Sequence, residues 1–266
     1  MSRIPNYSSL GAGPVVLFLH GIGGGHLAFA PQLETLAQAG FRAVAWDMPG
    51  YGHSDPIEPY TFKGLAEKCM ALIDALATRH GQQVSLVGHS MGGMVAQEVM
   101  VRRPELVSQL VLCGTSAAFG RADGDWQRQF VEQRMAPLQQ GKTMAEVARE
   151  LVPAMAGPRA LPAGLRLAEH CMAGVSPGTY RRALEALVTF DRRQALAQIS
   201  APTLLVAGEN DPNAPPEVMR KMEQRILGSR SVVMSGIGHL MNLESPDEFD
   251  QLLIHFLRET QALVRH

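Results

Sequence analysis

The sequence lacks several features that would place a chain in a specialised class. The apolar run nearest the N-terminus, Val15 to Leu19, is strand-sized, and no run approaches the ~18–20 residues that span a bilayer. The three cysteines stand far apart without a CxxC pair, which argues against a disulfide framework or a zinc knuckle and favours a reducing compartment. The formal net charge is only −1, so the chain has no basic footprint for DNA or RNA.

The first 14 residues contain one early charge and no apolar stretch long enough for a signal peptide. We therefore expect a cytoplasmic protein whose partner is a small molecule, with no nucleic acid and no membrane involved. With 266 residues, 46% apolar and 18% charged, the chain has an ordinary globular composition and suits one α/β domain carrying an insertion. A homodimer and a monomer both stay open.

Short apolar runs alternate with longer stretches of helical period, which predicts strand–helix–strand units around a mostly parallel sheet. The runs that predict strands are Val15–Leu19, Ala43–Trp46, Val84–Val87, Leu110–Cys113, Thr203–Ala207 and Ser231–Met234. Helices are predicted at about 27–39, 62–79, 91–102, 215–227 and 246–260. Because unbroken apolar strands are buried on both faces, we expect helices on both faces of the sheet.

Residues 117–196 interrupt this alternation. They contain no strand-like run, and prolines divide them into helical pieces. We therefore predict a core formed by residues 1–116 and 197–266, and a helical cap, the cap segment, formed by residues 117–196. The cap segment holds eleven basic and eight acidic residues. This excess weakly indicates an anionic substrate, and a solvated helix face explains it equally well.

A Gly-x-Ser-x-Gly motif, Gly88 to Gly92, stands directly between a predicted strand and a predicted helix. In that position a sharp turn strains the serine and lifts its hydroxyl above the sheet. Glycines are required two residues before and after the serine because side chains there would collide within the turn. The motif favours Ser90 as a nucleophile over a simple helix N-cap.

A serine nucleophile needs a base, and the base needs an orienting carboxylate. In a fold with this motif, the acid and then the histidine follow the serine along the chain. Asp211 follows the strand at 203–207, and His239 stands between the last strand and the last helix. Glu209 is a rival acid, but it lies nearer the strand and would point elsewhere. We predict Ser90, Asp211 and His239 as the catalytic residues.

The glycine-rich loop His20–Gly25 follows the strand at 15–19. Its glycines let the backbone approach a substrate, so we predict an oxyanion hole from the N–H groups of Ile22 and Met91, with Gly23 and Gly24 binding substrate. A phosphate cradle is the alternative, but the spacing does not give Gly-x-Gly-x-x-Gly. No metal-ligand spacing occurs, and we expect neither a metal nor another cofactor.

Five motifs together resemble the α/β-hydrolase superfamily over nearly the whole chain: HGIGG at 20–24, DMPGYGHS at 47–54, GHSMGG at 88–93, GENDPNAP at 208–215 and GIGHLMNLESP at 236–246. The resemblance implies an α/β-hydrolase fold, with a helical cap inserted after the sixth strand of a mostly parallel sheet. It also implies the roles already assigned to Ser90, Asp211 and His239. Because only about 14 residues precede the first clear strand, the N-terminal β-hairpin usual in this superfamily is expected to be shortened or partly missing.

Within the superfamily, residues 110–116 and 180–216 are similar to 3-oxoadipate enol-lactonases and related esterases. That likeness implies a serine hydrolase that opens a small carboxylic ester or lactone. Because position 90 is serine and not aspartate, the haloalkane dehalogenase and epoxide hydrolase branches are disfavoured. Two alternatives stay open: a carbon–carbon bond hydrolase of aromatic ring-cleavage products, and a slow-turnover ligand receptor on the same fold.

Overall fold

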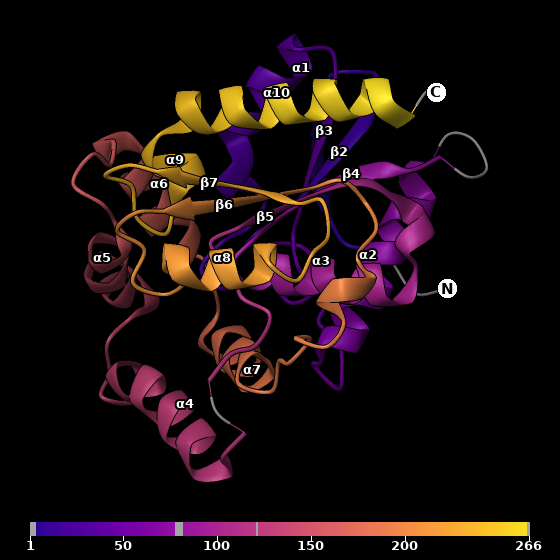
Figure 1. Cartoon of the computed structure of the whole chain (residues 1–266). Helices are drawn as coiled ribbons and strands as arrows, with labels where there is room; N and C mark the ends of the chain where they lie inside the picture. Colours follow the sequence, from indigo (N-terminus) through magenta and orange to yellow (C-terminus); the bar gives the residue numbers. More distant parts are fainter. Residues whose placement is uncertain (1–3, 78–81, 121, 265–266) are drawn as a thin grey trace.

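A computed structural model describes residues 4–77, 82–120 and 122–264 (Figure 1). The described residues form a seven-stranded sheet in the order β1-β3-β2-β4-β5-β6-β7. β1 pairs with β3 in antiparallel fashion, and every other pairing in the sheet is parallel. The strands are β1 (Tyr7–Leu10), β2 (Val15–Leu19), β3 (Arg42–Trp46), β4 (Val84–His89), β5 (Val107–Cys113), β6 (Thr203–Gly208) and β7 (Arg230–Met234).

Helices cover both faces of this sheet. Figure 1 shows α1 (Ala30–Gln38) and α10 (Pro246–Val264) over one face, and α2 (Phe62–Leu76), α3 (Met91–Arg102) and α8 (Pro216–Glu223) over the other. The short α9 (Met241–Glu244) directly precedes α10. Single turns of 3₁₀-helix occur at η1 (His26–Phe29), η2 (Pro104–Leu106) and η3 (Leu196–Gln198).

The sheet separates two hydrophobic cores. Val16 and Phe18 of β2 belong to the core beneath α1 and α10, whereas Leu17 and Leu19 belong to the core shared with α2 and α3. Successive side chains of a strand point to opposite faces, so one unbroken apolar run supplies both cores. This double burial explains why the strands of this chain show no alternation of polar and apolar residues.

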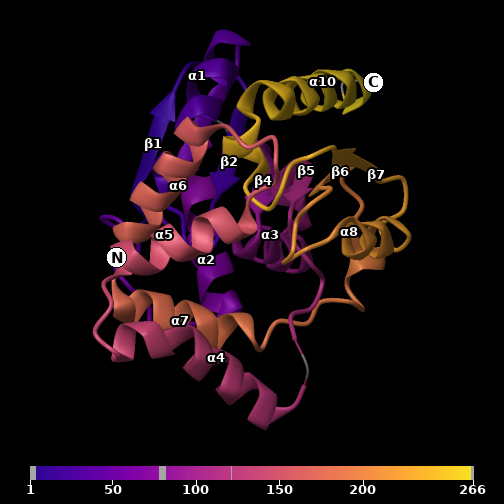
Figure 2. The ribbon, with the colours of Figure 1, turned by 90° about the vertical axis from the view of Figure 1, so that its left-hand side faces the viewer.

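Four helices of the cap segment lie between β5 and β6 in the chain: α4 (Gly124–Gln139), α5 (Met144–Met155), α6 (Pro162–Ala173) and α7 (Pro177–Leu187). Three of them begin at side-chain caps, in which Asp123, Thr143 and Ser176 accept backbone N–H groups of the first turn. In Figure 2 these four helices lie together at one edge of the sheet. That edge holds the carboxyl ends of the parallel strands, because β4, β5 and β6 all run toward it.

The six predicted strands are confirmed, with ends that differ by a few residues. The helix predicted at 62–79 ends at Leu76, and residues 78 and 79 lie outside the described residues. The predicted place of the cap in the strand order was wrong: the cap segment follows the fifth strand of the described chain, not the sixth. The reason is that, among the described residues, one strand, β1, precedes β2, where a two-stranded hairpin would have raised the count by one. Among the described helices, none has the length and apolar character needed to cross a membrane.

Candidate functional site

Ser90 occupies a strained turn between β4 and α3. Its φ of 53° and ψ of −120° make it the one non-glycine residue with positive φ in the described part of the chain. Such a conformation costs roughly 1–3 kcal/mol and persists only where the surroundings enforce it. Here the Ser90 N–H donates to the Cys113 carbonyl at 2.9 Å. A Cβ atom on Gly92 would lie 2.0 Å from the Leu19 carbonyl oxygen, so only glycine lets α3 start this close to β2.

Asp211 and His239 form a buried hydrogen-bonded pair at the same edge of the sheet. The His239 Nδ1 atom lies 2.7 Å from Asp211 Oδ2, and Asp211 Oδ1 accepts the N–H groups of Asn213 and Ala214 at 2.7 and 3.0 Å. Burial by itself raises the pKa of Asp211, but these hydrogen bonds outweigh it and the pKa is lowered. An ionised carboxylate only accepts, so the proton of His239 sits on Nδ1 and Nε2 is left as an acceptor.

Glu209, the rival acid, lies elsewhere. It accepts the Ser235 hydroxyl at 2.8 Å and the Gly236 N–H at 2.7 Å, and its side chain lies at the exposed surface. It therefore ties the end of β6 to the turn after β7. Of the two candidate carboxylates, Asp211 is the one that the fold brings to His239.

A second carboxylate, Glu244, holds the backbone around His239. It is fully buried and accepts the N–H groups of Gly238 at 2.7 Å and Leu240 at 2.8 Å, the two residues that flank His239. It also accepts the N–H of Gly157 in the cap segment at 2.8 Å. One carboxylate thus joins the histidine loop to the cap segment. Nothing in the sequence indicated a role for Glu244; its signal is its place in the GIGHLMNLESP motif, five residues after His239.

The loop after β2 is held by His20. Its Nε2 accepts the Met48 N–H at 3.0 Å, so its proton sits on Nδ1, which donates to the Gly21 carbonyl at 2.8 Å. Burial lowers the pKa of His20 to about 4, which keeps the ring neutral. The Gly21 carbonyl belongs to the peptide group that carries the Ile22 N–H, and the Tyr51 hydroxyl donates to the Ile22 carbonyl at 2.9 Å. Both neighbouring peptide groups are therefore fixed in orientation.

This loop lies beside Ser90. A Cβ atom on Gly21 would stand 3.0 Å from the Ser90 Cβ, which shows how closely the two backbones approach. Met91 is the first residue of α3, so its N–H has no acceptor within the helix and belongs to the positive end of the helix dipole. The predicted donors Ile22 and Met91 thus come from two segments that meet at Ser90.

Two cavities meet at Ser90 and His239. One, of about 70 Å³, lies toward η1, α6 and α9, and the other, of about 110 Å³, lies toward α4 and α7. Predicted substrate-binding residue Gly23 lines both cavities, and Gly24 lines the first only. The residues common to both are Ile22, Gly23, Ser90, Met155, Met172 and His239. A molecule bound across the junction would place one part in each cavity and a central bond beside Ser90.

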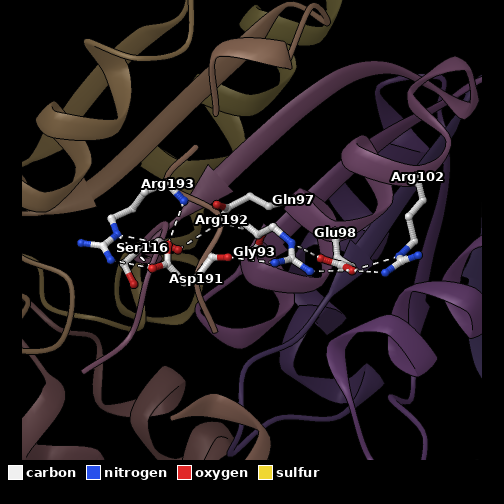
Figure 3. Close-up of polar contacts among 8 residues, drawn as sticks. All are labelled: Gly93, Gln97, Glu98, Arg102, Ser116, Asp191, Arg192 and Arg193. Atoms are coloured by element: carbon white, nitrogen blue, oxygen red, sulfur yellow. Dashed lines mark hydrogen bonds and ion pairs between the residues drawn. The ribbon is translucent and has the colours of Figure 1, made fainter. Parts of the chain in front are cut away.

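The helix that follows Ser90 is also the anchor of the cap segment (Figure 3). Glu98 on α3 is fully buried and accepts Arg102 Nε at 2.9 Å and Arg192 Nη2 at 3.0 Å. Gln97, one residue earlier, donates to the Ser116 carbonyl at 3.0 Å, and the Arg192 N–H donates to the Ala117 carbonyl at 2.7 Å. Both ends of the cap segment are therefore fastened to α3. Burial raises the pKa of Glu98, but its arginine partners outweigh burial and the pKa is lowered.

Within the described residues, no group of three or more His, Cys, Asp or Glu side chains is arranged to hold a metal ion. The polar groups at the junction of the cavities are a hydroxyl, an imidazole paired with a carboxylate, and backbone N–H groups. This set suits nucleophilic attack on a carbonyl group.

Comparison with known proteins places this arrangement in a family. The chain is similar to the serine hydrolase BPHL of Mus musculus, with 29% identity across 95% of this chain and 82% of the relative. It is similar to 3-oxoadipate enol-lactonase 1 of Acinetobacter baylyi, with 27% identity across 93% of this chain and 90% of the relative. Among solved structures, a thermophilic esterase from Thermogutta terrifontis, solved with malate bound, is 26% identical and superimposes with a TM-score of 0.85 over 96% of this chain and 93% of the esterase. The profile of the alpha/beta hydrolase family matches residues 16–252. The chain therefore belongs to the alpha/beta hydrolase family.

Proposed function

We propose that the protein is a serine hydrolase that cleaves a small carboxylic ester or lactone through an acyl-enzyme on Ser90. One observation carries the proposal: Ser90, on its positive-φ turn, and the hydrogen-bonded pair His239–Asp211 meet where two cavities join. The relatives that are a serine hydrolase, an enol-lactonase and an esterase support the same reaction class.

In the proposed reaction, His239 Nε2 takes the hydroxyl proton of Ser90 as the Ser90 oxygen attacks the substrate carbonyl. Asp211 keeps the proton of His239 on Nδ1 and stabilises the imidazolium that forms. The N–H groups of Ile22 and Met91 stabilise the oxyanion. His239 then gives its proton to the leaving alcohol oxygen. Water activated by the same histidine attacks the acyl-enzyme, which releases the acid and restores Ser90.

The neutral ring of His20 fixes the orientation of the peptide group that carries the Ile22 N–H. Because Nε2 of His20 accepts from Met48, its Nδ1–H is committed to the Gly21 carbonyl. The Ile22 N–H, at the other end of that peptide group, then points away from the ring. An oxyanion donor that is already oriented needs no reorganisation when negative charge develops, which is the main source of its catalytic effect.

The test is acid release, followed in a pH-stat, over short esters and small lactones with and without a carboxylate. We expect turnover by the wild type, and a fall in kcat/KM of about 10⁴-fold or more in Ser90→Ala. Ser235→Ala is the matched control, because that exposed serine lies near the histidine loop and lines neither cavity. It should retain wild-type activity.

Three results would reject the proposal. Near wild-type turnover by Ser90→Ala at matched purity would show that Ser90 is not the nucleophile. If no ester or lactone is turned over and a ring-cleavage dienoate is cleaved in a Ser90-dependent way, the protein is a carbon–carbon bond hydrolase. Acylation that stops after a single turnover would support the receptor alternative.

A further inference from the structure

The cavity toward α4 and α7 has a wall that is mostly apolar. Its apolar lining comes from the core and from the cap segment, and includes Met94, Phe119, Phe130, Leu151, Leu184 and Leu187. The lining also holds Ser116, whose hydroxyl donates to the Ala118 carbonyl at 2.8 Å, and the exposed Asn213. Two side chains from the cap segment, Arg134 on α4 and Tyr180 on α7, also carry hydrogen-bond donors. Neither is used by the proposed reaction at Ser90.

Arg134 lies half-buried in this wall without a counter-ion. Its guanidinium stacks over the Phe130 ring, 5.3 Å from the ring centre, and no carboxylate of the described chain lies within 4 Å. Among the described arginines of the cap segment, Arg128, Arg159 and Arg193 have acidic partners. Arg149, Arg166 and Arg182 have none within the described chain, but they line neither cavity at Ser90, whereas Arg134 does. Removing a guanidinium from water without an anion is unfavourable, so the position of Arg134 is suited to a negative charge that the protein itself does not supply.

The hydroxyl of Tyr180 also lacks a partner within the described residues. Tyr180 is only 3% exposed, and its hydroxyl makes no hydrogen bond to the described residues; the oxygen is not fully enclosed by protein, and Tyr180 lines the cavity. Burial raises the pKa of Tyr180, and the positive charge of Arg134 partly opposes that rise, which places the two groups within electrostatic reach of each other. Helices α4 and α7 pack against each other in the cap segment (Figure 2). A phenol and a guanidinium therefore face one cavity together.

We propose that Arg134 and Tyr180 bind a carboxylate of the substrate, so that the protein acts on an ester or lactone carrying a carboxylate separated by an apolar body from the scissile carbonyl. A guanidinium and a phenol can donate to the two oxygens of one carboxylate. The apolar wall between them and Ser90 suits a hydrocarbon chain or ring and excludes a second charge. This inference rests on the proposed function and names the substrate class of the same site.

The test compares two substrates that differ only in charge: mono(4-nitrophenyl) adipate, which keeps a free carboxylate, and its methyl ester, which masks it. We expect Arg134→Met to lower kcat/KM for the carboxylated ester by about 10- to 100-fold, the range of a charge-assisted hydrogen bond, and to change kcat/KM for the methyl ester less than about 3-fold. Tyr180→Phe should show the same selectivity with a smaller loss. Arg128→Met is the control, because it removes an equal charge from the exposed face of the same helix.

An equal loss on both substrates would overturn the proposal, since Arg134 would then act on folding or on the reaction itself. Equal kcat/KM of the two variants and the wild type on the carboxylated ester would also overturn it.

Calorimetric titration of adipate into wild type and Arg134→Met separates this result from a failure of the proposed function. If no ester is cleaved but adipate binds in an Arg134-dependent way, the carboxylate site stands and the reaction is different. If adipate does not bind and the neutral ester is turned over as well as the charged one, the carboxylate site is rejected.

Discussion

The carboxyl edge of the sheet and the cavity wall formed by α4 and α7 differ in how fully their polar side chains are paired. At the sheet edge, Asp211, Glu244 and His20 each bond to partners within the chain. In the wall formed by α4 and α7, Arg134 and Tyr180 face a cavity, and neither donates to an acceptor in the described chain. The groups around Ser90 are therefore held in place by the fold itself, whereas Arg134 and Tyr180 would find their partner in a bound substrate.

The largest loss of activity is expected when Asp211 is replaced, and Glu209, the other candidate acid, provides the comparison. Asp211→Asn should lower kcat by about 10⁴-fold, because the amide no longer fixes the tautomer of His239 or stabilises its imidazolium. Glu209→Gln is the matched control: it changes a carboxylate on the same loop that bonds to Ser235 and Gly236. Steady-state kinetics on one ester should separate the two by several orders of magnitude. Equal losses would mean that the pairing of Asp211 with His239 has no special part in catalysis.

A smaller effect is expected from Glu244→Gln. The amide can offer only one acceptor oxygen, so at least one of the N–H groups of Gly238, Leu240 and Gly157 loses its partner. The free energy of unfolding should fall by about 1–3 kcal/mol. kcat should fall by about 10- to 100-fold with KM nearly unchanged, because a displacement of about 1 Å at a reacting group is costly.

Glu223→Gln provides the control for this variant. Glu223 accepts the Ser231 N–H at 3.0 Å, so it also supports backbone, but at the start of β7 and away from His239. It should lose some stability and keep the wild-type kcat. If Glu244→Gln behaves in the same way, Glu244 supports only the fold and does not position the histidine.

The smallest effect is expected at the ion pair that joins α3 to the cap segment, and it is an effect on stability. Arg192→Met removes one of the two arginines that neutralise the buried Glu98 and should lower the free energy of unfolding by about 1–3 kcal/mol (Figure 3). Arg193→Met, one residue later, breaks an ion pair with the exposed Asp191 and should leave stability unchanged within error. Urea denaturation of both variants makes the comparison. Equal stability of the two would show that the anchor on α3 contributes nothing.

The parts of the site that sequence alone could predict depend on local chain geometry. Gly88 and Gly92 enforce the turn at Ser90, and a Cβ at either position would collide with backbone atoms. Asp211 and His239 follow neighbouring strands, β6 and β7, whose parallel pairing brings their ends to one edge. Short-range pattern and parallel topology were therefore enough to bring these residues together.

The parts that sequence could not predict depend on long-range contacts. Glu244 bonds to Gly157, 87 positions away, and the ring of His20 bonds to Met48, 28 positions away. No periodicity encodes such pairs. Strand β1 was missed because it is a four-residue edge strand with two serines, and it is defined only by its pairing with β3. The charge of the cap segment indicated an anion, but only the fold distinguishes Arg134 from arginines that already have partners.

Covalent labelling can show whether Ser90 is the nucleophile. Wild type, Ser90→Ala and His239→Ala would be treated with a fluorophosphonate and digested, and the adduct would be located by peptide mass spectrometry. We expect one adduct, on the peptide that contains Ser90. It should be absent in Ser90→Ala and form far more slowly in His239→Ala. An adduct on a different residue, or labelling of Ser90→Ala at the wild-type rate, would contradict this assignment.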